Sequence, residues 1–152
     1  MAAVEQQRIP LVPDPQRGPG PARLSRVAAS IAATWYGLRG WDVSWPLEPC
    51  RYDLLVTSGD EVRRVQVKST TTREGRAWKV YVSTTSGGRR SYEPSEVDEF
   101  FIIDGDGSCF RIPVDVVAGK KALSLAAHER FQVWTVPIRA ALGDETNQGE
   151  QR

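Results

Sequence analysis

The stretch RYDLLVTSGDEVRRVQVKSTTT constrains the fold more than any other part of the chain. Two runs rich in Val and Leu flank Gly59 and Asp60, and glycine followed by aspartate is typical of a two-residue hairpin turn. Folding the chain about this turn places Asp53 opposite Gln66. Gln66 and Lys68 are two residues apart, so on a strand they point to the same face. The hairpin is therefore expected to gather a carboxylate, an amide and an ammonium group at one place.

These groups suit a metal-dependent attack on a phosphate. Mg²⁺ prefers oxygen ligands, takes one or two carboxylates and keeps several waters, and Mn²⁺ can replace it. The predicted ligands are the Asp53 carboxylate, the Gln66 amide oxygen and the backbone carbonyl of Val67. Lys68 would orient or help deprotonate a metal-bound water and offset the charge of the phosphate. Taken alone, the three side chains also allow a simpler interpretation, in which they line the solvated face of an antiparallel hairpin.

The neighbouring residues favour a fixed hairpin. Alternate positions on both strands are apolar, so one face of the hairpin is expected to be buried and the pairing register to be specified. The polar triplet then lies on the other face, where a helix and loops can cover it. The apolar positions are Tyr52, Leu54, Val56, Val65 and Val67.

The 152 residues are expected to form one domain, over residues 23–142. Residues 1–22 hold five of the ten prolines and residues 143–152 have no apolar side chain, so both are expected to be disordered tails. Apolar spacing predicts a helix that runs to Leu38, with one buried face. The predicted order of helix, strand, hairpin, strand, short helix and strands indicates a mixed α/β sheet covered by helices. The predicted face is Leu24, Val27, Ala28, Ile31, Trp35 and Leu38, and the tryptophans expected in the core are Trp35, Trp41, Trp45 and Trp78.

The formal net charge of +1 is unevenly distributed. Residues 61–90 carry eight Lys and Arg against two Glu, which favours a polyanionic partner such as DNA. The predicted phosphate contacts are Arg73, Arg76, Arg89 and Arg90.

Localisation signals are absent from the sequence. The two cysteines are far apart and fit neither a disulfide framework nor a metal site. No apolar run approaches the length of a membrane span, and no signal peptide is recognisable. A cytoplasmic protein without membrane contact is expected.

The hairpin and its surroundings resemble the PD-(D/E)xK nuclease superfamily, which has the restriction-endonuclease-like fold. The chain is closest to homing-type members that carry Gln in the (D/E) position, and it is also similar to archaeal Holliday-junction resolvases. The resemblance covers about residues 24–118, and it implies an α-β-β-β-α-β core, magnesium dependence and cleavage of DNA phosphodiesters. It is carried by Leu38-Arg39-Gly40-Trp41, Val43, Pro46, Tyr52-Asp53-Leu54, Val65-Gln66-Val67-Lys68-Ser69, Trp78-Lys79-Val80, Tyr92 and Val97-Asp98.

Two departures from the family pattern bear on activity. Tyr52 stands where the motif name has Pro, a variable position. The family often carries a Glu on the first helix that completes the metal site, whereas spacing places Ala28 and Ala29 there. Glu48, which lies in a linker before the second strand, is a candidate substitute.

The leading hypothesis is a magnesium-dependent DNA endonuclease in which Asp53 and Gln66 bind metal and Lys68 activates water. Because one site cuts one strand, cleavage of both strands would suggest a homodimer or higher oligomer. Two alternatives stay open: a catalytically inactive module of the same fold that binds nucleic acid or a protein partner, and an unrelated α/β scaffold. The sequence does not identify the DNA target.

Overall fold

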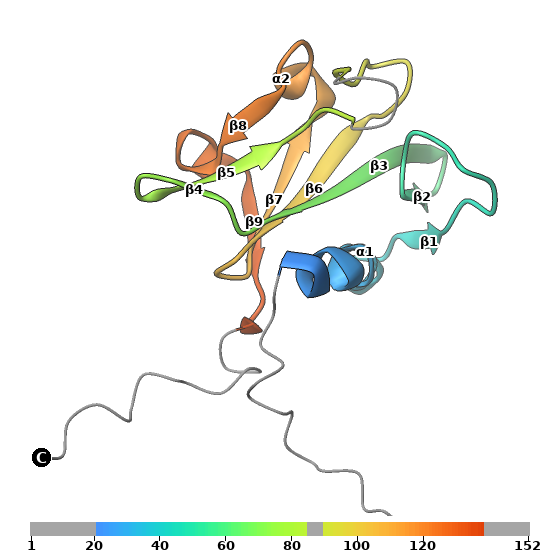
Figure 1. Cartoon of the computed structure of the whole chain (residues 1–152). Helices are drawn as coiled ribbons and strands as arrows, with labels where there is room; N and C mark the ends of the chain where they lie inside the picture. The colour runs from blue at the N-terminus through green and yellow to red at the C-terminus, as the bar shows by residue number, and fades with distance from the viewer. Residues whose placement is uncertain (1–20, 85–89, 139–152) are drawn as a thin grey trace, which may run out of the picture.

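The computed structural model describes residues 21–84 and 90–138, and its centre is a six-stranded sheet (Figure 1). The strand order is β1-β2-β3-β6-β7-β9, in which β3 and β6 run parallel and all other neighbours are antiparallel. The predicted mixed α/β architecture is confirmed. The strands are β1 Asp42–Ser44, β2 Leu54–Ser58, β3 Glu61–Thr70, β6 Glu99–Asp104, β7 Ser108–Pro113 and β9 Gln132–Thr135.

One long helix, α1 Pro21–Leu38, covers one face of this sheet (Figure 1). Proline suits the first helical position because its missing N–H would have no partner there. Gly40, with a φ of +84°, turns the chain after the helix. The buried side of the helix is Leu24, Ala28, Ala32, Trp35 and Tyr36.

Two residues that were predicted to lie on the buried face of the helix are exposed, so the prediction is wrong for them. Val27 is 48% exposed and Leu38 is 77% exposed. The buried row advances in steps of four from Leu24, so it lies beside the row that contains Val27.

The other face of the sheet is covered by a second, three-stranded sheet and short helices. Two cores result, and the strands serve both because successive side chains alternate between faces. Phe101 and Ile103 of β6 enter the core under α1, whereas Phe100 and Ile102 enter the opposite core. The covering elements are β4 Arg73–Glu74, β5 Ala77–Tyr81, α2 Val114–Val117, β8 Ala122–Ser124 and the 3₁₀ helix η2 Leu125–Phe131.

The connection from β3 to its parallel neighbour β6 contains the predicted strand, but a turn takes the place of the predicted short helix. Its described residues form the antiparallel pair β4 and β5 and a turn at residues 94–96. Trp78, Val80 and Val82 alternate with polar residues, and this period of two favours a strand over a helix.

The predicted hairpin is confirmed in position and register. Gly59 takes a φ of +58° at the turn, and Leu54 pairs with Val65. Since β2 begins at Leu54 while β3 continues to Thr70, the second half of β3 pairs with β6 alone within the main sheet. The hairpin therefore leaves one edge of β3 open beyond Asp53.

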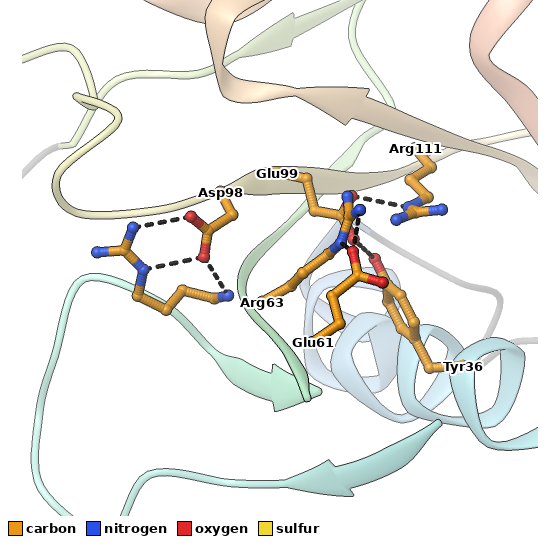
Figure 2. Close-up of polar contacts among 7 residues, drawn as sticks. Tyr36, Glu61, Arg63, Asp98, Glu99 and Arg111 are labelled. Carbon is orange, nitrogen blue, oxygen red and sulfur yellow. Dashed lines mark hydrogen bonds and ion pairs between the residues drawn. The ribbon is translucent and has the colours of Figure 1, made fainter. Parts of the chain in front are cut away.

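A buried carboxylate ties α1 to the sheet (Figure 2). Glu99, at 1% exposure, accepts hydrogen bonds from the Tyr36 hydroxyl at 2.5 Å, Arg111 Nε at 2.7 Å and Arg63 Nη1 at 3.1 Å. Arg63 also pairs with Glu61. This cluster joins four elements, α1, β3, β6 and β7.

The predicted tails fall almost wholly outside the described residues. Within the ranges 21–84 and 90–138, no helix is long and apolar enough to span a membrane.

Candidate active site

Asp53 is fixed against the open edge of β3. Its backbone N–H donates to the Val65 carbonyl at 2.9 Å, which extends the hairpin pairing by one residue. Its Oδ2 accepts the Val67 backbone N–H at 2.8 Å and the Gln66 side-chain Nε2 at 2.6 Å. The Val67 N–H is available because β2 pairing has ended at this point, so the carboxylate takes the place of a strand carbonyl.

Gln66 lies between two oxygen atoms. Its amide nitrogen donates to Asp53 Oδ2 and also lies 3.3 Å from the Val67 carbonyl oxygen. The side chain is buried, at 8% exposure. A half-turn of the amide exchanges Nε2 for Oε1 and would present three oxygens, from Asp53, Val67 and Gln66, to one point.

This donor set fits a hard divalent cation. All three atoms are oxygens, one is anionic, and Mg²⁺ completes its shell with water or substrate oxygens. The described part of the chain contains no cluster of three or more His, Cys, Asp or Glu side chains that could hold a metal. A cation held beside Gln66 would therefore depend on Asp53 for an anionic ligand.

Lys68 lies two residues along β3, with Nζ 5.4 Å from the centre of the Tyr92 ring. Burial lowers the pKa of Lys68, with a smaller contribution from the like charge of Arg51, and the attraction of Asp53 opposes both. Burial also raises the pKa of Asp53, against the Val67 N–H and the charge of Lys68. Desolvation thus moves both groups toward their neutral forms.

A hollow of about 290 Å³ brings these groups together beneath α1. Ala28 and Ala29, the two residues at which spacing places the family Glu, form part of its wall. The helix therefore contributes methyl groups and the hydroxyl of Ser25, without a carboxylate. The remaining lining residues are Asp53, Gln66, Val67, Lys68 and Ser69.

Glu48 lies on the exposed connection between β1 and β2. It lines a second hollow, of about 340 Å³, which also reaches Asp53. It does not line the hollow that contains Gln66 and Lys68.

Three of the four predicted phosphate-binding arginines are described, and none of these three lines this hollow. Arg73 pairs with Asp106 at 3.2 Å and packs 3.7 Å from the Trp78 ring. Arg76 lines a separate hollow of about 230 Å³. Arg90 is exposed and pairs with Glu96, and Arg89 lies outside the described residues.

Sequence reasoning missed two neighbours of Lys68. Arg51 stacks 4.4 Å from the centre of the Tyr92 ring, and its Nη2 lies 3.2 Å from Glu96 Oε2. Arg51 precedes Asp53 by two residues, and this spacing alone could have pointed to it. No local signal could place Tyr92, which follows a long connection.

Comparisons with known proteins identify the family and the fold of the chain. A family profile described as PD-(D/E)XK endonuclease matches residues 26–135, which include the hairpin and most of α1. Among solved structures, the chain is similar to a bacterial homing endonuclease, I-Ssp6803I, with a TM-score of 0.59 and 22% identity over 84% of this chain and 81% of that one. This likeness shows a shared restriction-endonuclease-like fold. No curated protein sequence matches the chain. Because the profile spans most of its length, the chain belongs to the PD-(D/E)XK endonuclease family.

Proposed function

We propose that the protein is a metal-dependent DNA endonuclease whose site is the hollow between α1 and the open edge of β3. The observation that carries this proposal is the convergence of Asp53, Gln66, the Val67 carbonyl and Lys68 on that hollow. Asp53, Gln66 and Val67 would hold Mg²⁺ or Mn²⁺ through oxygen atoms.

When bound, the metal would supply Lewis-acid stabilisation of the phosphate and a more acidic water. The protein groups do the rest of the work. The Val67 N–H fixes the Asp53 carboxylate, so the anionic ligand does not have to be ordered during the reaction. Lys68 orients the attacking water, assists removal of its proton and faces the charge of the scissile phosphate. Burial of Lys68 favours this role, because it lowers the cost of the neutral amine.

The proposed unit of function is the domain over residues 23–142, acting on DNA. One hollow can cut one strand, so cutting both strands requires two copies of the site. A homodimer or higher homo-oligomer would supply them.

The direct test is nicking of supercoiled plasmid in Mg²⁺ by wild type and Lys68→Ala. Loss of the lysine is expected to slow nicking by about 10²- to 10⁴-fold, the usual effect of removing a general acid or base. Lys120→Ala is the matched control, since Lys120 is exposed and lies outside the site hollow. A wild type that fails to nick, or a Lys68→Ala variant as fast as wild type, would refute the assignment.

A second candidate function is supported by the alanines in the hollow. With Ala28 and Ala29 in its wall, the described site has one carboxylate, as expected for an inactive module that binds nucleic acid or a protein. Titration of Mn²⁺ followed by electron paramagnetic resonance separates the two. Binding that disappears in Asp53→Ala supports the nuclease, whereas no Asp53-dependent binding supports the inactive module.

A further inference from the structure

The connection between β1 and β2 exposes apolar side chains beside the candidate site. We call residues 45–50, with the sequence WPLEPC, the 45–50 loop. Trp45 is 56% exposed and Leu47 is 97% exposed. Trp45 was expected in the core as the third member of an alternating strand, but β1 ends at Ser44, so that prediction is wrong.

The loop is stiffened in this exposed form. Pro46 and Pro49 each fix their own φ and restrict the residue before them, which here includes Trp45. A stiff loop loses less conformational entropy when it docks. Trp45 and Leu47 are therefore exposed to solvent on a loop that would lose little entropy on binding a partner.

The 45–50 loop is continuous with the site. Together with Tyr52 and Asp53 it lines the hollow of about 340 Å³, and Asp53 also lines the hollow that contains Gln66 and Lys68. Successive nucleotides of a DNA strand are only about 3.4 Å apart along the helix axis. A strand with a phosphate at Asp53 therefore has its next nucleotides within reach of the loop.

The charge of the loop shows which part of DNA it suits. It contains no Lys or Arg, and its one charged side chain is Glu48, which repels phosphate. Contact with the phosphate backbone is disfavoured, whereas Trp45 and Leu47 match the aromatic and aliphatic groups that stack on bases or wedge between base steps.

We propose that the 45–50 loop packs Trp45 and Leu47 against the bases next to the scissile phosphate, unstacking or distorting the DNA there. This inference rests on the proposed function, because it takes the phosphate at Asp53 as its reference point. It assigns a base-contacting role to a loop that carries neither metal ligands nor basic residues.

DNA binding in Ca²⁺ tests the inference without cleavage. The probe is a fluorescently labelled short duplex of mixed sequence, with binding followed by anisotropy. Trp45→Ala and Leu47→Ala are each expected to weaken binding by about tenfold, in the range found for lost base stacking. Trp45→Phe should recover much of the affinity. Leu38→Ala is the matched control, because Leu38 is also apolar and exposed, at 77%, but lies at the C-terminal end of α1 and lines neither hollow.

The salt dependence separates base contact from phosphate contact. A lost phosphate contact reduces the slope of log K against log salt by about 0.9, whereas a lost apolar contact leaves the slope unchanged. Both loop variants are expected to keep the wild-type slope.

A cross-link then locates the contact. Of the two cysteines in the chain, Cys50 is exposed on the loop and Cys109 is buried. Duplexes that carry on one base a tether ending in a mixed disulfide are expected to exchange with the Cys50 thiolate close to the nicked position, releasing the small thiol, and Cys50→Ser should abolish this cross-link.

The outcomes distinguish the two proposals. If wild type nicks plasmid but the loop variants bind like Leu38→Ala, the inference is overturned and the proposed function stands. If wild type binds no DNA, both fail. A dimer that Trp45→Ala converts to monomer, with DNA affinity per protomer unchanged, would assign the loop to a second copy and also overturn the inference.

Discussion

At the scale of single residues, the Gln66 amide lies next to the point at which the proposed cation would bind. Its nitrogen bridges Asp53 and the Val67 carbonyl. Gln66→Glu would replace this donor with a carboxylate 2.6 Å from Asp53. We expect the metal-free variant to lose about 2 kcal/mol, the cost of a hydrogen bond to a charged group. Added Mg²⁺ should recover more stability in the variant than in wild type.

Thermal unfolding with and without Mg²⁺ measures this effect. Glu74→Gln, on the exposed β4 strand, is the control for a change of charge elsewhere. If Mg²⁺ raised the Tm of wild type and Gln66→Glu equally, Gln66 would not be a metal ligand.

Asp53 gives a pH dependence at the same scale. Burial raises its pKa in the folded state, so the folded protein binds its proton more tightly than the unfolded chain does. The associated stability is present below the ordinary Asp pKa and is lost as pH rises through the folded-state value. Asp53→Asn removes this loss. We therefore expect the metal-free variant to be more stable than wild type at neutral pH, with the difference shrinking toward acid pH.

Urea denaturation of wild type and Asp53→Asn in EDTA, from acid to neutral pH, tests the sign of this stability difference. A difference that grows toward acid pH would contradict it. Asp115→Asn, on the exposed side of α2, controls for the loss of one carboxylate.

At the scale of elements, the position of α1 depends on the cluster around Glu99 (Figure 2). Tyr36, near the end of the helix, donates to Glu99, and the same helix lines the site hollow through Ala28. Glu99→Gln would remove the buried anion that the partly exposed Arg111 and Arg63 share. We expect a loss of about 3 kcal/mol in the free energy of unfolding, measured in urea.

Glu61→Gln is the control for this change, since it removes an exposed partner of the same Arg63. The control should stay within about 1 kcal/mol of wild type. Equal losses in the free energy of unfolding for the two substitutions would show that the burial of Glu99 adds nothing to its effect on stability.

Sequence alone predicted those elements whose determinants are local. The hairpin followed from Gly59 and the alternation around it, and with it came the meeting of Asp53 and Gln66. The outward position of Trp45 depends on where β1 stops pairing with β2, a long-range property. The approach of Tyr92 to Lys68 has no local signal for the same reason, whereas the period of two at Trp78 and Val80 predicted the strand β5 locally.

At the scale of the whole molecule, the basic window is largely neutralised by acids from elsewhere in the chain. Eight Lys and Arg against two Glu give residues 61–90 a net charge of +6. Most of the carboxylates that pair with these cations lie outside that window, so the unpaired positive surface is smaller than this net charge suggests. The ion pairs of these cations within the described residues are Arg63 with Glu61 and Glu99, Arg64 with Asp98, Arg73 with Asp106, Lys79 with Glu74 and Arg90 with Glu96.

Arg76 is a cation of this window that internal ion pairing leaves free to contact DNA. It is exposed and forms no ion pair with any residue in the described ranges. Arg76→Ala is expected to reduce the slope of log K against log salt by about 0.9, because one phosphate contact is lost. Arg64→Ala should keep the wild-type slope, since its guanidinium already binds Asp98 at 2.8 Å. Anisotropy titrations of a duplex over a range of salt concentrations measure both slopes. If the two variants lowered the slope equally, internal pairing would not decide which cations meet DNA.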